Sequence, residues 1–269
     1  MNKHEHKMLE LLKRGKQEFG VVATKAEFEA EGTRVDELLR LLEIAYKADV
    51  PLTLKIGGCE AIRDLLEAKQ FGVSYVVAPM VETSYALTKY IAAKNKVFSE
   101  YEQEHTDFLF NIETITGYEN RLDIVKTAAQ DGGVDGVVFG RVDFVGSLGT
   151  GRDGIEDESV TQYVCDVATL CKEHEIDFVL GGAISIDVVQ TLKRVREVKL
   201  TRFETRKVVF SGSALEMTDM KQALLDAVHF ELLWLINKQE YYGVIHREDD
   251  ARIQMLESRW KILQNNVVD

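Results

Sequence analysis

The chain has 269 residues, of which 45% are hydrophobic and 29% are charged. This composition is typical of a folded globular protein and excludes a disordered or collagen-like chain. Because 45 acidic side chains outnumber 33 basic ones, the formal charge is −12, and such a surface repels nucleic-acid backbones. We therefore expect no nucleic-acid partner, whereas a small carboxylate substrate is compatible with this charge if a metal ion or local basic groups offset it.

The sequence offers no sign of a membrane partner. No apolar run reaches the roughly 18 residues that a membrane-spanning helix needs, and residues 1–17 are polar and charged, unlike a signal peptide. Cys59, Cys165 and Cys171 follow neither zinc-site nor redox-motif spacing, so we interpret them as packing residues. These features predict a cytoplasmic protein.

Short apolar runs alternate with amphipathic segments between residues 20 and 215, as in β–α units built on a parallel sheet. In chain order, strands are expected at residues 21–30, 52–56, 75–81, 108–113, 136–140, 178–182 and 203–210. Residues 1–269 then form one α/β domain, and a TIM-type (β/α)8 barrel at 20–215 suits the length better than an open doubly wound sheet. The eighth strand is not evident, and we expect two strands where the single long segment 21–30 stands.

Residues 216–269 are predicted to form a wholly helical C-terminal extension. The segment 223–236 is apolar nearly all round, and Ile253, Leu256, Trp260 and Leu263 share one stripe further along. Such helices must be covered, either by the barrel or by a neighbouring subunit. We expect a homo-oligomer with this extension at its interface.

Ionisable side chains share one face of several expected strands, because residues i and i+2 of a strand point the same way. These rows are Lys25, Glu27, Glu29 and Glu31; Thr53 and Lys55; Asn111 and Glu113; and Arg202, Glu204 and Arg206. A solvated edge strand would explain one such row, but not four strands whose opposite face is apolar. Buried charges must pair, meet water or hold a metal, and the mouth at the carboxyl ends of barrel strands allows this.

Two carboxylates close successive expected strands. Glu113 and Asp143 are 30 positions apart, about one β–α unit, so they should meet at the same rim of the barrel. Carboxylates brought close repel each other unless a proton or a cation lies between them. Oxygen ligands suit Mg²⁺ or Mn²⁺, and zinc is less suited because none of the six histidines ends an expected strand. The plain structural alternative is a helix N-cap and a turn aspartate.

Three segments, VAPMVET (77–83), FNIET (110–114) and VDGVVFGRVDFVGSLG (134–149), together resemble the HpcH/HpaI aldolase and citrate lyase beta-subunit family of the phosphoenolpyruvate/pyruvate barrel superfamily. The resemblance covers residues 20–225. It implies a TIM barrel of metal-dependent enzymes that make or break a carbon–carbon bond beside an enolate. It also implies that Glu113 and Asp143 ligate Mg²⁺ or Mn²⁺, and that backbone NH groups around Gly140, Val142 and Asp143 hold the substrate carboxylate.

The sequence departs from the family pattern at three places. Lys55 stands where the family usually has an arginine that steadies the enolate, and lysine supplies charge without the bidentate fork. The segment FEAEG (28–32) has no histidine to act as a base. Asn111, which we place at the substrate-binding site, replaces the glutamine common before the metal ligand in aldolase members.

The leading hypothesis is a metal-dependent carbon–carbon lyase, or aldolase, acting through the enolate of pyruvate or a related 2-oxo acid. In it Lys55 and Arg141 add positive charge, and Glu29, Glu31 or a metal-bound water moves the proton. A Schiff base on Lys25 is a minor alternative, because carboxylates around an amine raise its pKa. Two other hypotheses stay open: a CoA-thioester lyase of citrate or malyl type, and a non-catalytic metabolite-binding barrel.

Overall fold

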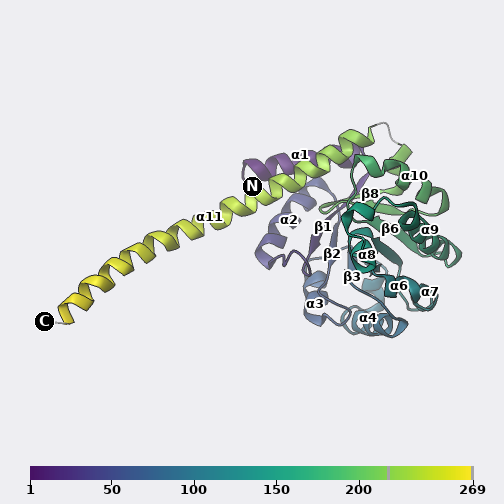
Figure 1. Ribbon diagram of the computed structural model, residues 1–269, viewed down its shortest axis with the longest axis horizontal. Coiled ribbons are helices and arrows are strands. Elements are labelled where there is room, and N and C mark those ends of the chain that lie inside the picture. Colours follow the sequence, from purple (N-terminus) through teal and green to yellow (C-terminus); the bar gives the residue numbers. More distant parts are fainter. Residues whose placement is uncertain (217–218, 268–269) are drawn as a thin grey trace.

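Eight strands close into a barrel in chain order, as the sequence predicts for a TIM-type fold (Figure 1). The computed structural model describes the backbone of residues 1–216 and 219–267, and side chains as far as residue 261. The strands are β1 (Val21–Glu27), β2 (Leu52–Lys55), β3 (Tyr75–Ala78), β4 (Asp107–Ile112), β5 (Gly136–Gly140), β6 (Asp177–Gly181), β7 (Arg202–Glu204) and β8 (Val208–Ser211). The expected first strand, 21–30, therefore ends three residues early, at Glu27, and is a single strand.

Helices alternate with these strands and surround the barrel (Figure 1). They are α1 (Lys3–Glu18), α2 (Val35–Ala48), α3 (Ile62–Gln70), α4 (Ser84–Val97), α5 (Glu100–Gln103), α6 (Ile115–Glu119), α7 (Arg121–Ala128), α8 (Arg141–Leu148), α9 (Glu158–Glu173), α10 (Val189–Val198) and α11 (Met220–Val267). Within the described residues, no helix has the combination of length and apolar composition that crossing a membrane demands.

The eighth strand lies inside the expected seventh. The run 203–210 folds back on itself at Thr205, giving β7 and β8, and β8 pairs antiparallel with both β7 and β1. The Thr205 hydroxyl accepts a hydrogen bond from the Val208 amide (3.1 Å), and the Thr205 amide donates to the Val208 carbonyl (2.9 Å). Because the chain reverses here, Val209 faces the barrel interior beside Glu204, whereas a single strand over 203–210 would put these two residues on opposite faces. Arg206, expected in the inward row with Glu204, lies in the turn with a half-exposed side chain, so that expectation is wrong.

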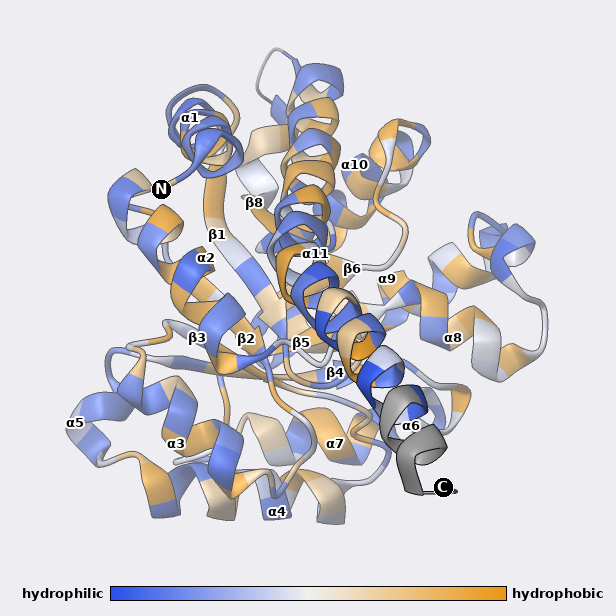
Figure 2. Ribbon diagram, turned by 90° about the vertical axis from the view of Figure 1, so that its left-hand side faces the viewer, coloured by the Kyte–Doolittle hydropathy of each residue, from blue (hydrophilic) through white to orange (hydrophobic). Residues whose placement is uncertain are grey.

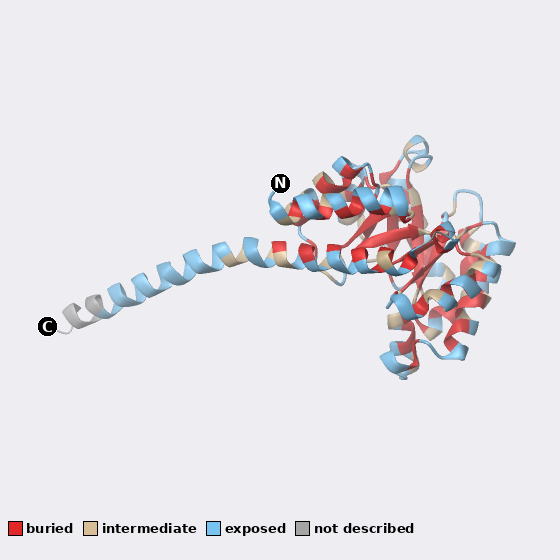
Figure 3. Ribbon diagram, turned by 90° about the horizontal axis from the view of Figure 1, so that it is seen from above, coloured by how far each residue is buried: buried red, intermediate tan, exposed pale blue. Residues whose placement is uncertain are grey.

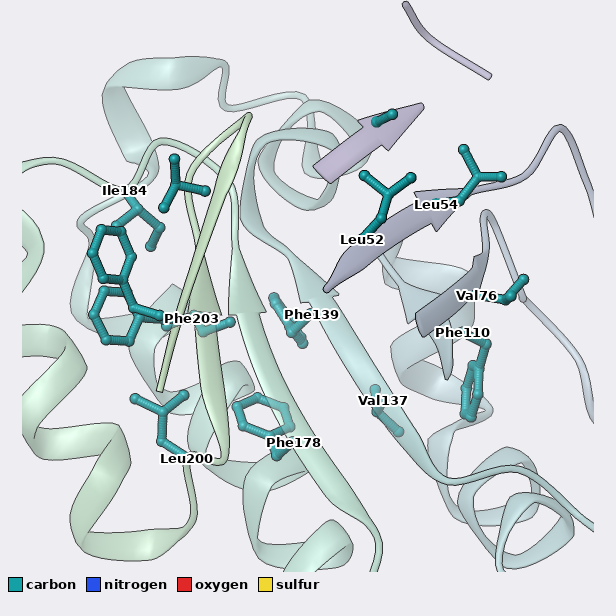
Figure 4. Close-up of a cluster of buried hydrophobic side chains, with 14 of the residues drawn as sticks. Leu52, Leu54, Val76, Phe110, Val137, Phe139, Phe178, Ile184, Leu200 and Phe203 are labelled. Carbon is teal, nitrogen blue, oxygen red and sulfur yellow. The ribbon is translucent and has the colours of Figure 1, made fainter. Parts of the chain in front are cut away.

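The strands are apolar on both faces below the mouth, as parallel sheets covered by helices require. Outward side chains such as Phe110 and Phe139 belong to the main hydrophobic cluster under the helices (Figure 4). The Phe108 ring, in the same cluster, meets the rings of Tyr90 and Phe98 edge-on. Inward side chains form a separate small cluster of Val77, Leu109, Val138 and Val179. The barrel is thus packed through its middle, and any small-molecule site must lie at an end.

An ion cluster fills the amino end of the barrel. Arg202, which the sequence places in an inward row, bonds Asp177 at 2.8 Å and lies 3.6 Å from Asp107. Its guanidinium stands over the Tyr75 ring at 4.4 Å from the centroid, a cation–π distance. Arg202 therefore closes the end opposite to the mouth.

The C-terminal extension is one helix, α11, where the sequence suggested several helices. Its first part packs beside α1, and the rest extends away from the barrel (Figures 1 and 3). Glu5 of α1 joins this corner, because its carboxylate accepts hydrogen bonds from Arg40 of α2 and from Asn237 of α11. The Leu263 side chain, which the sequence placed on an apolar stripe, lies outside the described residues.

The three cysteines are free, and Cys165 and Cys171 are buried in α9 as packing residues. Burial raises the pKa of the Cys171 thiol to about 12, so this thiol stays protonated and unreactive at neutral pH.

Candidate active site

The carboxyl ends of β1, β2, β4 and β7 bring five ionisable side chains together at the mouth of the barrel. They are Lys25, Glu27, Lys55, Glu113 and Glu204, each at most 7% exposed. Their positions follow from strand alternation, since the neighbours Ala26, Leu54 and Ile112 point outward into the apolar layer. The inward row of charges that the sequence predicts is therefore present, and its members pair with one another.

Glu113 is the most enclosed of these acids, at 2% exposed. Its Oε2 accepts hydrogen bonds from Lys55 Nζ (3.2 Å) and Asn111 Nδ2 (2.6 Å), and its Oε1 accepts one from the Met80 amide (2.9 Å). Met80 has a φ of +53°, a left-handed conformation that costs a non-glycine residue about 1–3 kcal/mol. Three donors from three strand ends thus fix the carboxylate of Glu113.

Lys55 bridges two acids. Its ammonium lies 3.2 Å from Glu113 Oε2 and 3.2 Å from Glu29 Oε2. Burial lowers the pKa of Lys55, but attraction from Glu113 and Glu29 outweighs it, and the pKa is raised overall. The Lys55 side chain is therefore a fixed positive charge in the mouth, and Glu29, at 30% side-chain exposure, is its link to solvent.

Lys25 forms the second ion group, with Glu204 at 2.5 Å and Glu27 at 3.1 Å. Burial lowers the pKa of Lys25, but the two carboxylates raise it more, so that the amine remains protonated at neutral pH. This argues against Lys25 as a Schiff-base nucleophile.

Glycines shape the floor beside Glu113. A Cβ on Gly140 would lie 2.8 Å from Glu113 Oε2, and one on Gly182 would lie 2.8 Å from the backbone nitrogens of both Arg141 and Val142. Those nitrogens open α8, whose N-cap, Gly140, makes no side-chain capping bond. The first amides of a helix lack partners within it and carry partial positive charge, so this end of α8 can bind an anion.

The Arg141 side chain points away from this anion site. Its guanidinium, 1% exposed, donates to the Gly182 carbonyl (2.8 Å from Nη2) and pairs with Glu156 (2.9 Å). It thereby holds the loop that carries Gly182 over the start of α8.

Of the sequence-predicted site residues, the structure gathers Lys55, Glu29, Asn111, Glu113 and Gly140 into direct contact. Glu31 and Asp143, like Arg141, have different surroundings. Glu31 pairs with Arg206 (3.0 Å) and with Lys207 at the β7–β8 turn. Asp143 is exposed in the first turn of α8, three residues beyond Gly140, and forms no ion pair or hydrogen bond with the side chains that the structure describes.

The oxygen atoms of Glu113 and Asn111 suit a hard cation. Within the described residues, no three or more His, Cys, Asp or Glu side chains form a metal cluster. However, Glu113 Oε1 has one hydrogen-bond donor and so keeps a lone pair, and Asn111 Oδ1 is a buried acceptor with no partner among the described groups. With the exposed carboxylate of Asp143 in the first turn of α8, these are oxygen ligands of the kind that Mg²⁺ or Mn²⁺ prefers, with waters or substrate completing the shell.

Sequence reasoning missed Met80, Gly182 and the role of Glu204. Glu204 belongs to an inward row that the sequence shows, and its partner Lys25 lies on the same rim. The left-handed φ of Met80 has no local signature, because methionine does not favour it. Gly182 follows Gly181 at the end of β6, and such a glycine pair predicts a turn. The pair does not predict that this turn packs against the start of α8.

Fold and site together define a barrel protein whose charged mouth lies beside the N-terminus of a helix. Residues 24–209 match the model of HpcH/HpaI aldolase/citrate lyase. The chain belongs to this family of lyases, as the sequence motifs suggested.

Solved structures support the fold. The structure is similar to citrate synthase SbnG (18% identity, TM-score 0.58, 74% of this chain and 81% of that one). It is also similar to an HpcH/HpaI aldolase from Desulfitobacterium hafniense DCB-2 (15%, 0.59, 74% and 82%) and to an HpcH/HpaI aldolase/citrate lyase family protein from Burkholderia cenocepacia J2315 (15%, 0.55, 83% and 84%). No curated protein matches the sequence.

Proposed function

We propose that the protein is a carbon–carbon lyase of the aldolase type that acts through the enolate of pyruvate or a related 2-oxo acid. The observation that carries the proposal is the buried Lys55–Glu113–Asn111 group beside the uncapped start of α8. The Lys55 ammonium supplies fixed positive charge, and the first amides of α8 supply hydrogen-bond donors. A 2-oxo acid needs both, because its carboxylate is already an anion and its keto oxygen becomes one.

The amides of Arg141 and Val142 bind the substrate carboxylate in this proposal, with Gly182 leaving room above them. Lys55 faces the oxygen on which negative charge develops. A preorganised charge in a buried mouth stabilises such an oxygen more than the same charge would in water. Glu113 and Glu29 keep the Lys55 ammonium in place and protonated.

Glu113 and Asp143 would hold a Mg²⁺ or Mn²⁺ ion, with the Asn111 amide oxygen nearby. When bound, the ion would supply Lewis-acid stabilisation of developing negative charge on the substrate. Asn111 and the Met80 amide orient the Glu113 carboxylate for this task.

Glu29 is our candidate for moving the proton at the carbon next to the keto group. Glu27 and Glu204 are held by Lys25, whereas Glu29 is partly exposed and touches Lys55, so it can exchange protons with solvent.

The test is deuterium exchange into the methyl group of pyruvate and of longer 2-oxo acids, followed by NMR in deuterated water with Mg²⁺ or Mn²⁺. We expect metal-dependent exchange in the native protein, its loss in Glu113→Ala, and native exchange in Glu119→Gln, which changes an exposed acid on α6. If the native protein binds 2-oxo acids without exchanging them, it is a metabolite-binding barrel and the proposal fails.

A further inference from the structure

Helix α11 has two opposite apolar faces, and the described part of the chain covers only one. Ala223, Ala227, Phe230 and Trp234 face the barrel and are at most 3% exposed. On the other side, four large apolar side chains are each 53–59% exposed: Leu225, Val228, Leu232 and Leu235. Figure 3 shows the buried residues ending where α11 leaves the barrel.

The sequence continues this spacing along the helix. Alternating steps of three and four residues lead from Leu225, Val228, Leu232 and Leu235 through Gln239, Tyr242, His246 and Asp249 to Ile253, Leu256, Trp260 and Leu263. This is the a/d seam of a heptad repeat, which keeps one stripe facing a partner helix. The barrel-facing residues Ala223, Ala227, Phe230 and Trp234 take the f and c positions, which lie opposite the seam. A partner on the seam therefore leaves these barrel-facing residues undisturbed. The seam meets the barrel at Tyr242, whose hydroxyl donates to Glu37 of α2 (2.7 Å).

The distal part of α11 needs such a partner. Every side chain described from Val244 to Lys261 is exposed, including Ile253 (52%), Leu256 (47%) and Trp260 (63%). Isolated helices are marginal in water, and Gly243 weakens this one further by about 0.5–1 kcal/mol. Figure 2, which looks along α11 toward the barrel, shows hydrophobic residues recurring down its length.

We propose that the partner is α11 of a second copy of this chain, in a parallel, in-register two-stranded coiled coil. Flanking charges select this arrangement. In a parallel pair, each g position meets the e position five residues further along the other helix, so Arg252 meets Glu257 of the second copy. In an antiparallel pair, g meets g and e meets e. Arg252 and Arg259 would then face arginine, and Asp250 and Glu257 would face acids.

Polar residues interrupt the seam only at its centre, at Gln239, His246 and Asp249. Polar residues at a and d lower the stability of a coiled coil but specify its register. In the in-register pair Asp249 meets the same residue of the second copy, which weakens the centre, so the two flanking apolar segments, Leu225–Leu235 and Ile253–Leu263, carry the pairing. The proposal is independent of the chemistry at the barrel mouth.

The first test is the mass of the full chain in solution by light scattering at micromolar concentration. We expect twice 30.5 kDa for the native protein. The double variant Ile253→Asp/Leu256→Asp should have half that mass with unchanged barrel unfolding, because both side chains lie on the exposed distal part of α11. The matched control Gln254→Asp/Ser258→Asp places the same charges outside the seam and should keep the native mass. A monomeric native protein, or a double variant of native mass, would overturn the proposal.

Two further variants test orientation. Leu256→Cys should form a disulfide between copies on mild oxidation, whereas Ser258→Cys, on the outer face, should not. Arg252→Glu should weaken association at least tenfold, and Arg252→Glu/Glu257→Arg should restore it. Cross-linking at position 258 but not 256, or association unaffected by the single charge change, would rule out the parallel seam.

Discussion

Gly140 is in contact with Glu113, and any side chain there displaces the carboxylate. An alanine Cβ would lie 2.8 Å from Oε2 and 2.9 Å from the Cβ of Glu113. We expect Gly140→Ala to lower the free energy of unfolding by about 1–3 kcal/mol, as overpacking does, and to slow pyruvate exchange at least tenfold. Gly146→Ala is the control, because its Cβ meets nothing within 4 Å and alanine favours the helix. Equal exchange in both variants would contradict this role of Gly140.

Glu27 makes stability depend on acid pH. Burial raises its pKa, but Lys25 at 3.1 Å lowers it more, so the folded-state pKa is below the usual 4.5. The unfolded state then binds the proton first, and the contribution of Glu27 to stability is present above pH 4.5 and lost as the pH falls through the folded-state pKa. In urea titrations from pH 7 to pH 3, Glu27→Gln should be less stable than the native protein at pH 7 and lose less stability on acidification. If the free energies of unfolding of the two proteins fell in parallel with pH, Glu27 would not contribute to the pH dependence of stability.

Strand alternation predicts the inward side chains well. Lys25, Lys55, Asn111 and Glu113 lie where their positions in period-2 runs put them, because the pleat of a strand is local geometry. Their pairing could not be predicted, since the choice between Glu29 and Glu31 for Lys55 depends on how the loop after β1 turns.

The amides at the start of α8 lie directly against Gly182. Gly182→Ala would put a methyl group 2.8 Å from the amides of Arg141 and Val142, and its φ of +88° strains alanine. Gly149→Ala carries the same kind of strain, at +75°, with open space around the Cβ. Gly149→Ala should lose about 1 kcal/mol of stability from backbone strain alone, and Gly182→Ala should lose about 1–3 kcal/mol more from the clash with backbone atoms. Only Gly182→Ala should raise the KM for a 2-oxo acid at least tenfold. A similar KM in both variants would show that the α8 amides do not bind the substrate.

The β7–β8 hairpin shows where element prediction fails. The turn at Thr205, Arg206 and Lys207 contains no glycine, proline or asparagine, so periodicity alone extends one strand through it. Tertiary contacts hold the reversal: Lys207 is 2% exposed, pairs with Glu31 and stands over the Trp234 ring. The turn thus depends on α11, which follows it in the chain.

Substitutions of the two tryptophans of α11 distinguish the stability of the barrel from the association of two copies. Trp234 is 2% exposed against the barrel, and Trp260 is 63% exposed far from it. Trp234→Ala should lower the free energy of unfolding of the barrel by about 3–5 kcal/mol. Trp260→Ala should leave barrel unfolding unchanged at protein concentrations where the chain is monomeric. Comparable destabilisation by both changes would mean that α11 packs differently on the barrel.

We expect Glu113 and Asp143 to act as one cation site at the mouth of the barrel, where the proposed substrate would bind. The most direct measurement is titration of Mn²⁺ followed by electron paramagnetic resonance, with and without pyruvate. We predict that one Mn²⁺ binds per native chain, that pyruvate tightens the binding, and that Glu113→Ala and Asp143→Asn each weaken it at least tenfold while Glu119→Gln does not. Native binding in Asp143→Asn, or binding indifferent to pyruvate, would contradict the account.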